Sequence, residues 1–149
     1  MGKLVSEINI RWKGDVFQLF LFPNHFSNIC PDIIHSVDLV AGQWGTVDSI
    51  ILWNYNIGGG KSVAKEIIEV VDKEKKSIRY KVIEGDVMQV YNEFKISVDV
   101  NAITEEDNLV TWTIDYNKKS EAMPEPTFIL EAGLAMTKQI ENHPIIFPN

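Results

Sequence analysis

The chain has 149 residues, of which 45% are hydrophobic and 23% charged, and its net charge at pH 7 is −7. This length and composition predict one globular domain over residues 1–149. The negative charge argues against nucleic-acid binding and against binding to an anionic membrane surface, because both need clustered Lys and Arg. No apolar run approaches the ~18 residues of a membrane span.

Cys30 is the only cysteine, so the sequence offers neither an internal disulfide nor a cysteine-based zinc site. A reduced compartment suits such a chain, and its start lacks the long apolar run of a signal peptide, so we expect a cytoplasmic protein. Met1–Ser6 fits the loose pattern for N-myristoylation, but the same residues open a strand pattern, which we favour. The three histidines lack metal-ligand spacing, and we expect no metal and no cofactor.

The predicted elements begin with a strand over Leu4 to Ile10, where apolar and polar residues alternate. Asp15 then caps a short helix that ends at Pro23, and a second short helix is expected over Phe26 to Ile34. Further strands are expected at 37–40, 47–56, 63–71, 78–83, 91–100 and 109–116, and a final helix at about 127–142.

The order of these elements predicts an α+β fold. Strands that follow one another through short turns form an antiparallel meander with one wet face and one dry face. The final helix is the element that can cover the dry face, and two short helices close one end.

Two interpretations of the dry face remain open at this point. Ala132, Gly133 and Met136 on the inner stripe of the final helix are small or adaptable, which favours an apolar pocket beneath it. The alternative is a filled core, in which large side chains of the sheet touch the helix directly. Periodicity alone does not separate the two.

Several strings together indicate a family. They are Ile29-Cys30-Pro31-Asp32, Val37-Asp38-Leu39, Gly42-x-Trp44-Gly45-Thr46-Val47-x-Ser49, Trp53-Asn54-Tyr55, Val82-Ile83-Glu84-Gly85-Asp86, Trp112-Thr113 and Pro124-Glu125-Pro126-Thr127. In this combination and order the chain resembles the major latex protein or ripening-related group of the birch-pollen-allergen (pathogenesis-related class ten) superfamily. The resemblance implies the helix-grip, START-like fold, with a seven-stranded curved antiparallel sheet, two short helices and a long C-terminal helix over an internal hydrophobic cavity.

That fold implies a set of ligand-binding residues on the inner faces of its elements. From the sheet they are Ile8, Ile10, Ile50, Leu52, Tyr80, Val82, Phe94, Ile96, Val98, Trp112, Ile114 and Tyr116. From the short helices they are Phe20, Phe26 and Ile29, and from the final helix Ile129, Ala132, Met136 and Ile140. Tyr80, Tyr116 or Asn54 would orient a ligand by hydrogen bonding.

The resemblance implies binding or carriage of an apolar small plant metabolite or hormone, linked to defence or stress. The alternative is a cofactor-independent cyclase or isomerase acting on a reactive terpenoid or alkaloid intermediate in specialised metabolism. Its catalytic candidates are Asp48, Tyr80 and Tyr116, since burial would raise the pKa of an inward-facing Asp48. A position at the rim, capping the nearby turn, is the other interpretation of Asp48. We expect a monomer or a weak dimer.

Two departures from the family pattern bear on the pocket. The family usually has glycine where this chain has Asp48. The final helix carries Glu131-Ala132-Gly133 where bulkier or aromatic residues are common in relatives. We expect the second departure to widen the pocket locally.

Overall fold

The sheet is the largest element of the computed structural model, which describes residues 1–144; the last five residues of the expected domain lie outside the described part. Its seven antiparallel strands follow the order β1-β7-β6-β5-β4-β3-β2. They are β1 (Gly2–Arg11), β2 (Ile34–Ala41), β3 (Ile50–Ile57), β4 (Gly60–Asp72), β5 (Ser77–Gly85), β6 (Tyr91–Ala102) and β7 (Asp107–Lys118). Each strand from β2 to β7 pairs with the next in the chain, as the predicted meander requires.

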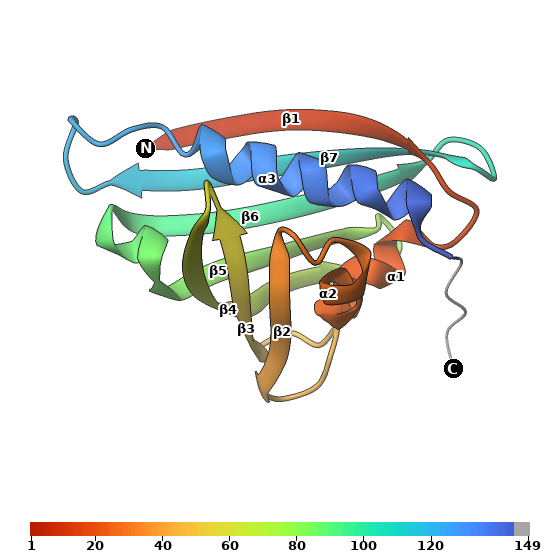
Figure 1. Ribbon diagram of the computed structural model, residues 1–149, viewed down its shortest axis with the longest axis horizontal. Helices are drawn as coiled ribbons and strands as arrows, with labels where there is room; N and C mark the ends of the chain where they lie inside the picture. Colours follow the sequence, from red (N-terminus) through yellow and green to blue (C-terminus); the bar gives the residue numbers. More distant parts are fainter. Residues whose placement is uncertain (145–149) are drawn as a thin grey trace.

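The helices lie on the inner side of this sheet. They are α1 (Val16–Leu21), α2 (Phe26–Ile29) and α3 (Thr127–Lys138), with single 3-10 turns η1 (Pro23–His25), η2 (Asp86–Gln89) and η3 (Gln139–Asn142). Figure 1 shows α3 extended along the sheet, with α1 and α2 together near β2. The α+β helix-grip fold is therefore confirmed.

Several element boundaries differ from the prediction by a few residues, and two of these differences have a clear structural cause. Helix α2 ends at Ile29, because Pro31 disfavours helical geometry at the residue before it, and Ile34 already pairs with Tyr55 in the sheet. Strand β3 begins at Ile50, because the residues before it form a turn in which Asp48 has a φ of 72°. Both errors lie at places where tertiary pairing overrides a local apolar pattern.

The inner face of β3 is also not the one predicted. Ile51 and Trp53 are buried on it, whereas Ile50 and Leu52 are half-buried on the opposite face. This strand is apolar on both parities, so the sequence pattern gives no indication of which side faces inward. The pairing of Trp53 with Ala64 on β4, also buried, settles the orientation.

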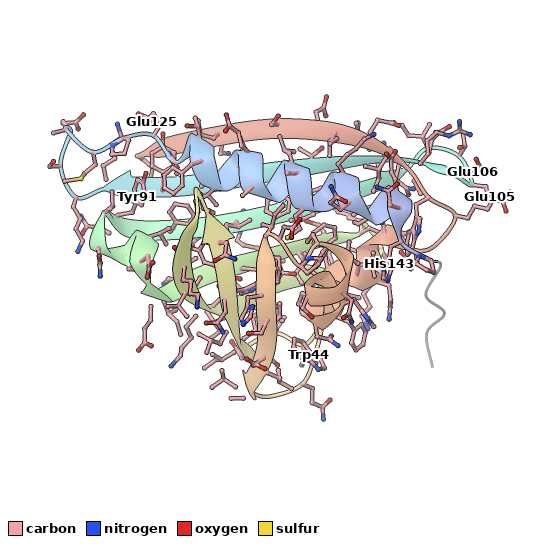
Figure 2. The ribbon with its side chains drawn as sticks, in the orientation of Figure 1. Trp44, Tyr91, Glu105, Glu106, Glu125 and His143 are labelled. Carbon is pink, nitrogen blue, oxygen red and sulfur yellow. The ribbon has the colours of Figure 1, made fainter. Side chains whose placement is uncertain are left out.

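Helix α3 is fixed to the sheet at its N-terminal end by polar contacts. The Tyr91 hydroxyl donates a hydrogen bond to the backbone oxygen of Pro124 over 2.7 Å, and Lys118 forms an ion pair with Glu125. Figure 2 shows Tyr91 and Glu125 at this end of the helix. These contacts place the start of α3 above the ends of β6 and β7.

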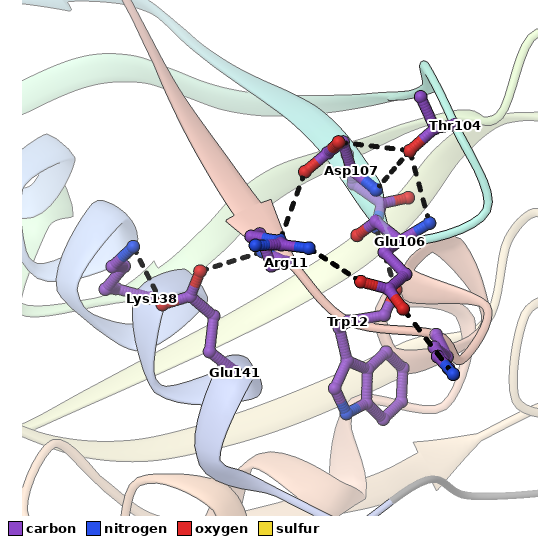
Figure 3. A network of polar contacts seen from close by, with 9 residues as sticks. Arg11, Trp12, Thr104, Glu106, Asp107, Lys138 and Glu141 are labelled. Carbon is purple, nitrogen blue, oxygen red and sulfur yellow. Dashed lines mark hydrogen bonds and ion pairs between the residues drawn. The ribbon is translucent and has the colours of Figure 1, made fainter.

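A second set of contacts holds the C-terminal end. Glu141 in η3 accepts a hydrogen bond from the backbone N–H of Arg11 over 2.8 Å, while the Arg11 guanidinium pairs with Glu106 over the same distance. The Trp12 indole N–H donates to the backbone oxygen of His143 over 2.8 Å. Figure 3 shows Arg11 between the η3 carboxylate and the β6–β7 turn. Helix α3 is thus a roof anchored at both ends.

Gly85 gives a direct test of the packing between β4 and β5. Its φ is 130°, and a Cβ there would collide with the backbone oxygen of Val63 and lie 2.9 Å from the Cα of Ala64. We expect Gly85→Ala to lower the free energy of unfolding by roughly 3 kcal/mol or more, measured by urea denaturation. Gly59→Ala is the control, because φ is 82° there but the space is open, and it should cost only about 1 kcal/mol. Equally small losses of unfolding free energy in Gly85→Ala and Gly59→Ala would contradict this packing.

Candidate ligand-binding cavity

A cavity of about 90 Å³ lies between the inner face of the sheet and α3. Its wall combines residues of α1, strands β2 to β7, η2 and α3, and nearly all of them are apolar. Ile33, Ile57 and Ala132 are half-buried, so the cavity comes close to solvent where these three residues meet its edge. Because typical pockets for drug-sized ligands measure ~300–1,000 Å³, this arrangement suits a compact molecule, and a larger one requires the wall to move.

About half of the predicted ligand-binding residues lie on the cavity wall. The residues in this group are Phe20, Tyr80, Val82, Phe94, Ile96, Trp112, Ile129, Ala132 and Met136. They come from α1, β5, β6, β7 and α3, elements that are distant in the chain and that the fold brings together. Their part in binding a ligand stays a prediction.

The other predicted residues lie elsewhere. Ile10, Phe26, Ile29, Val98, Ile114, Tyr116 and Ile140 are buried in the core, Ile8 is half-buried against it, and Ile50 and Leu52 lie on the outer face of β3. The cavity occupies only part of the inner face, because the rest is packed directly against the helices. The prediction therefore treated the whole inner face as cavity wall, although much of it is filled core.

Nine lining residues are absent from the predicted ligand-binding set, although Gly133 among them was expected on the inner stripe of the final helix. They are Ile33, Ile34, Trp53, Tyr55, Ile57, Ala64, Glu66, Val87 and Gly133. The correct parity of β3 would have supplied Trp53, Tyr55 and Ile57. Val87 lies in the η2 turn, for which the sequence carries no strong signal.

Gly133 does not widen the cavity, contrary to expectation. The ring of Trp112 lies against it, and a Cβ at this position would be 2.6 Å from the ring carbon Cζ3. The Trp112 indole N–H donates to the Thr137 hydroxyl over 3.0 Å, and that hydroxyl donates to the Gly133 backbone oxygen over 2.7 Å. The small residue on the helix therefore accommodates a large one on the sheet.

Asp48 is exposed, which ends its candidacy as a buried acid or base. Its backbone N–H donates to the oxygen of Ile68 over 2.8 Å, and its φ of 72° lies in the left-handed region. Glycine adopts that region most easily, and Asp tolerates it. The backbone geometry accounts for the glycine that relatives usually carry at this position.

Of the three predicted orienting groups, only Tyr80 lies at the cavity. Its hydroxyl already donates a hydrogen bond to the backbone oxygen of Phe20, and burial together with the nearby Glu66 raises its pKa well above the ordinary range. Tyr116 packs against Tyr91, with ring centroids 5.7 Å apart, and does not line the cavity. Asn54 is on the outer parity of β3, where it donates to Ser36.

Glu66 is the acidic residue of the cavity wall, and its side chain is buried. It lies on β4 between the fully buried Ile51 on β3 and Val82 on β5. Burial raises its pKa from the ordinary 4.5 to about 8, because desolvation disfavours the charged carboxylate. The Trp53 indole N–H opposes this shift but makes no hydrogen bond of good geometry, so desolvation prevails.

The sequence contained a weak signal for Glu66. On β4 it shares its parity with Ala64 and Ile68, whereas Lys65 and Glu69 share the other parity. Adjacent charges such as Lys65-Glu66 usually indicate a solvated face. The inward orientation of the Glu66 carboxyl is therefore difficult to predict from the sequence.

Comparisons with known proteins agree with this architecture. The model of the "Pathogenesis-related protein Bet v 1 family" matches residues 1–145. MLP-like protein 43 of Arabidopsis thaliana is 36% identical over 146 residues, covering 96% of this chain and 92% of that protein. The crystal structure of ginseng major latex-like protein 151 from Panax ginseng superposes with a TM-score of 0.89 at 42% identity, covering 95% of this chain and 96% of that chain.

A more distant structure extends the same fold. A START superfamily protein from Mycobacterium smegmatis has a TM-score of 0.74 at 12% identity, over 94% of each chain, and shows the fold alone. The fold and its apolar cavity thus define a START-like helix-grip protein. The chain belongs to the pathogenesis-related Bet v 1 family, in its major latex protein group, and this family binds hydrophobic ligands.

The relatives differ in length. The chain spans 44% of MLP-like protein 28 and 46% of MLP-like protein 34 from Arabidopsis thaliana, less than half of each. Within residues 1–144, no helix combines the length and apolar character needed to cross a membrane.

The raised pKa of Glu66 makes stability depend on pH. Between pH 4.5 and about 8 the folded protein retains a proton that the unfolded chain has released. The contribution of Glu66 to the free energy of unfolding is therefore complete below pH 4.5 and falls by about 1.4 kcal/mol per pH unit until it is lost above pH 8.

We expect Glu66→Gln to remove this component. Urea denaturation at about pH 5, 7 and 9 should show the difference between wild type and variant moving steadily in favour of the variant as pH rises. Glu84→Gln, at an exposed position on β5, is the matched control and should show no such trend. A Glu66→Gln difference independent of pH would contradict the buried, protonated carboxyl.

Proposed function

We propose that the protein binds a compact apolar plant metabolite or hormone in this cavity and carries it in the cytoplasm, as one ligand-binding domain over residues 1–149. The observation that carries the proposal is the apolar cavity between the sheet and α3. Apolar area removed from water would supply most of the affinity, at about 25 cal/mol per Å² before ordering costs. Membership of a family that binds hydrophobic ligands supports it. A link to defence or stress rests on the family resemblance.

An enzymatic role, as a cyclase or isomerase without a cofactor, is the second candidate. Asp48 is exposed and Tyr116 does not line the cavity, so two of the three predicted catalytic candidates cannot reach a bound substrate. Glu66 is the observation that keeps this function open, because a buried carboxyl with a pKa of about 8 can exchange a proton near neutral pH. Binding comes first in either case, and the same experiment tests it.

A larger side chain on the α3 side of the cavity should weaken ligand binding. Ala132 lines the cavity from α3, whereas Ala135 is exposed on the same helix. We expect Ala132→Leu to weaken binding of the apolar probe indane by about tenfold or more, because the added side chain takes space that the ligand needs. Isothermal titration calorimetry measures the effect, and Ala135→Leu is the matched control with unchanged affinity. Equal affinities for both variants would place the binding site elsewhere.

A further inference from the structure

The polar groups of the cavity wall differ in whether the protein itself pairs them. The Tyr80 hydroxyl donates to the Phe20 backbone oxygen, and the Trp112 indole N–H donates to Thr137 over 3.0 Å. Both donors are therefore occupied without a ligand. Only a polar group of the wall that has no such partner can form a hydrogen bond with a ligand.

The Trp53 indole N–H is buried and makes no hydrogen bond of good geometry within residues 1–144, although the Glu66 carboxyl lies close to it. The side chain is only 8% exposed and lines the cavity. A buried donor without a partner is rare in folded proteins, because it loses its hydrogen bonds to water and gains none in return. Such a group needs an acceptor, and the cavity is the place from which one can come.

Glu66 lies beside this donor on the same face of the sheet. Trp53 pairs with Ala64 across β3 and β4, and Glu66 is the next inward residue of β4, so the two side chains are diagonal neighbours. The Trp53 N–H lies close enough to the Glu66 carboxylate to lower its pKa as a hydrogen-bond donor, although the contact lacks the geometry of a formed hydrogen bond. Glu66 as a whole is 5% exposed and also lines the cavity.

We propose that Glu66 and Trp53 form a polar anchor in the cavity that binds a neutral oxygen, a carbonyl or a hydroxyl, of an otherwise apolar ligand. The ligand oxygen accepts a hydrogen bond from the Trp53 indole N–H and a second from the protonated Glu66 carboxyl. The rest of the ligand lies against the apolar wall beneath α3.

The surroundings of the anchor select a neutral group. Burial keeps the Glu66 carboxyl protonated at neutral pH, since its pKa is about 8, and a protonated carboxyl is a donor. A ligand carboxylate would have to enter an apolar space beside a second carboxyl. A ligand ammonium group would leave the Trp53 donor without an acceptor.

The test compares two probes of nearly equal shape, indane and 1-indanone, which differ by one carbonyl oxygen. This inference rests on the proposed cavity binding, and indane alone reports that binding. Dissociation constants are measured by calorimetry for wild type, Glu66→Met, Trp53→Phe, Glu66→Gln and Glu84→Gln. The last variant changes an exposed carboxyl on β5 that does not line the cavity, and it is the matched control.

The expected result is a change in the ratio of the two dissociation constants. Glu66→Met and Trp53→Phe should each reduce the preference for 1-indanone by about fivefold or more, with indane binding retained. Glu66→Gln should keep the preference, because its amide still donates, and Glu84→Gln should leave it unchanged. In wild type the preference should decline above pH 8, and in Glu66→Gln it should not.

Other outcomes would overturn the inference. A ratio equal in wild type, Glu66→Met and Trp53→Phe would mean that no anchor exists, although cavity binding would stand. A Glu66-dependent preference for 1-aminoindane over 1-indanone would make Glu66 an anionic site for amines instead. If no variant bound indane, wild type included, the proposed cavity binding itself would fail.

Discussion

The contact between Trp112 and Gly133 sets how closely the roof approaches the sheet. The Trp112 ring projects from β7 into the space that a side chain on α3 would otherwise occupy, and Thr137 fixes its indole N–H over 3.0 Å. Because Gly133 has no side chain, α3 packs close to the sheet although the Trp112 ring lies between them. The cavity lies beside this ring, which forms part of its wall.

The contacts at the two ends of α3 determine where the helix lies over the cavity, and the buried Glu66 carboxyl determines the polarity of the cavity wall. Tyr91 at one end and Arg11 at the other hold the helix over the sheet and the cavity. Glu66 is buried beneath the helix, and the loss of water raises the pKa of its carboxyl to about 8. A neutral donor inside an apolar wall costs less than a buried charge and still gives a ligand one point of orientation. The fold therefore links roof geometry to the chemistry of the site.

The sequence predicted well those features that depend on local pattern. The alternation in β1, β6 and β7 gave their inward residues, and the apolar stripe gave the final helix. The order of elements, strengthened by the family resemblance, gave the architecture. Trp112 and Met136 reached the cavity wall as expected.

The features that it missed depend on tertiary contacts. The face of β3 could not be predicted because both parities are apolar, and the pairing with β4 decides it. Glu66 follows a lysine and resembles a surface charge until the register places it inside. Gly133 indicated added space, but the Trp112 ring, which fills this space, lies on the preceding element β7. Local sequence pattern was sufficient to predict the architecture, whereas several cavity residues depend on pairing between segments that are distant in the chain.

The most direct measurement uses the indole N–H resonances of the four tryptophans in a two-dimensional ¹H–¹⁵N NMR spectrum. Trp53 and Trp112 line the cavity, whereas the Trp12 indole bonds to His143 outside it and Trp44 lies in the loop before β3, far from α3 (Figure 2). On titration with 1-indanone, the account predicts large shifts for Trp53 and Trp112 and unchanged positions for Trp12 and Trp44. Shifts confined to Trp12 or Trp44 would contradict the claim that the space beneath α3 is the ligand site.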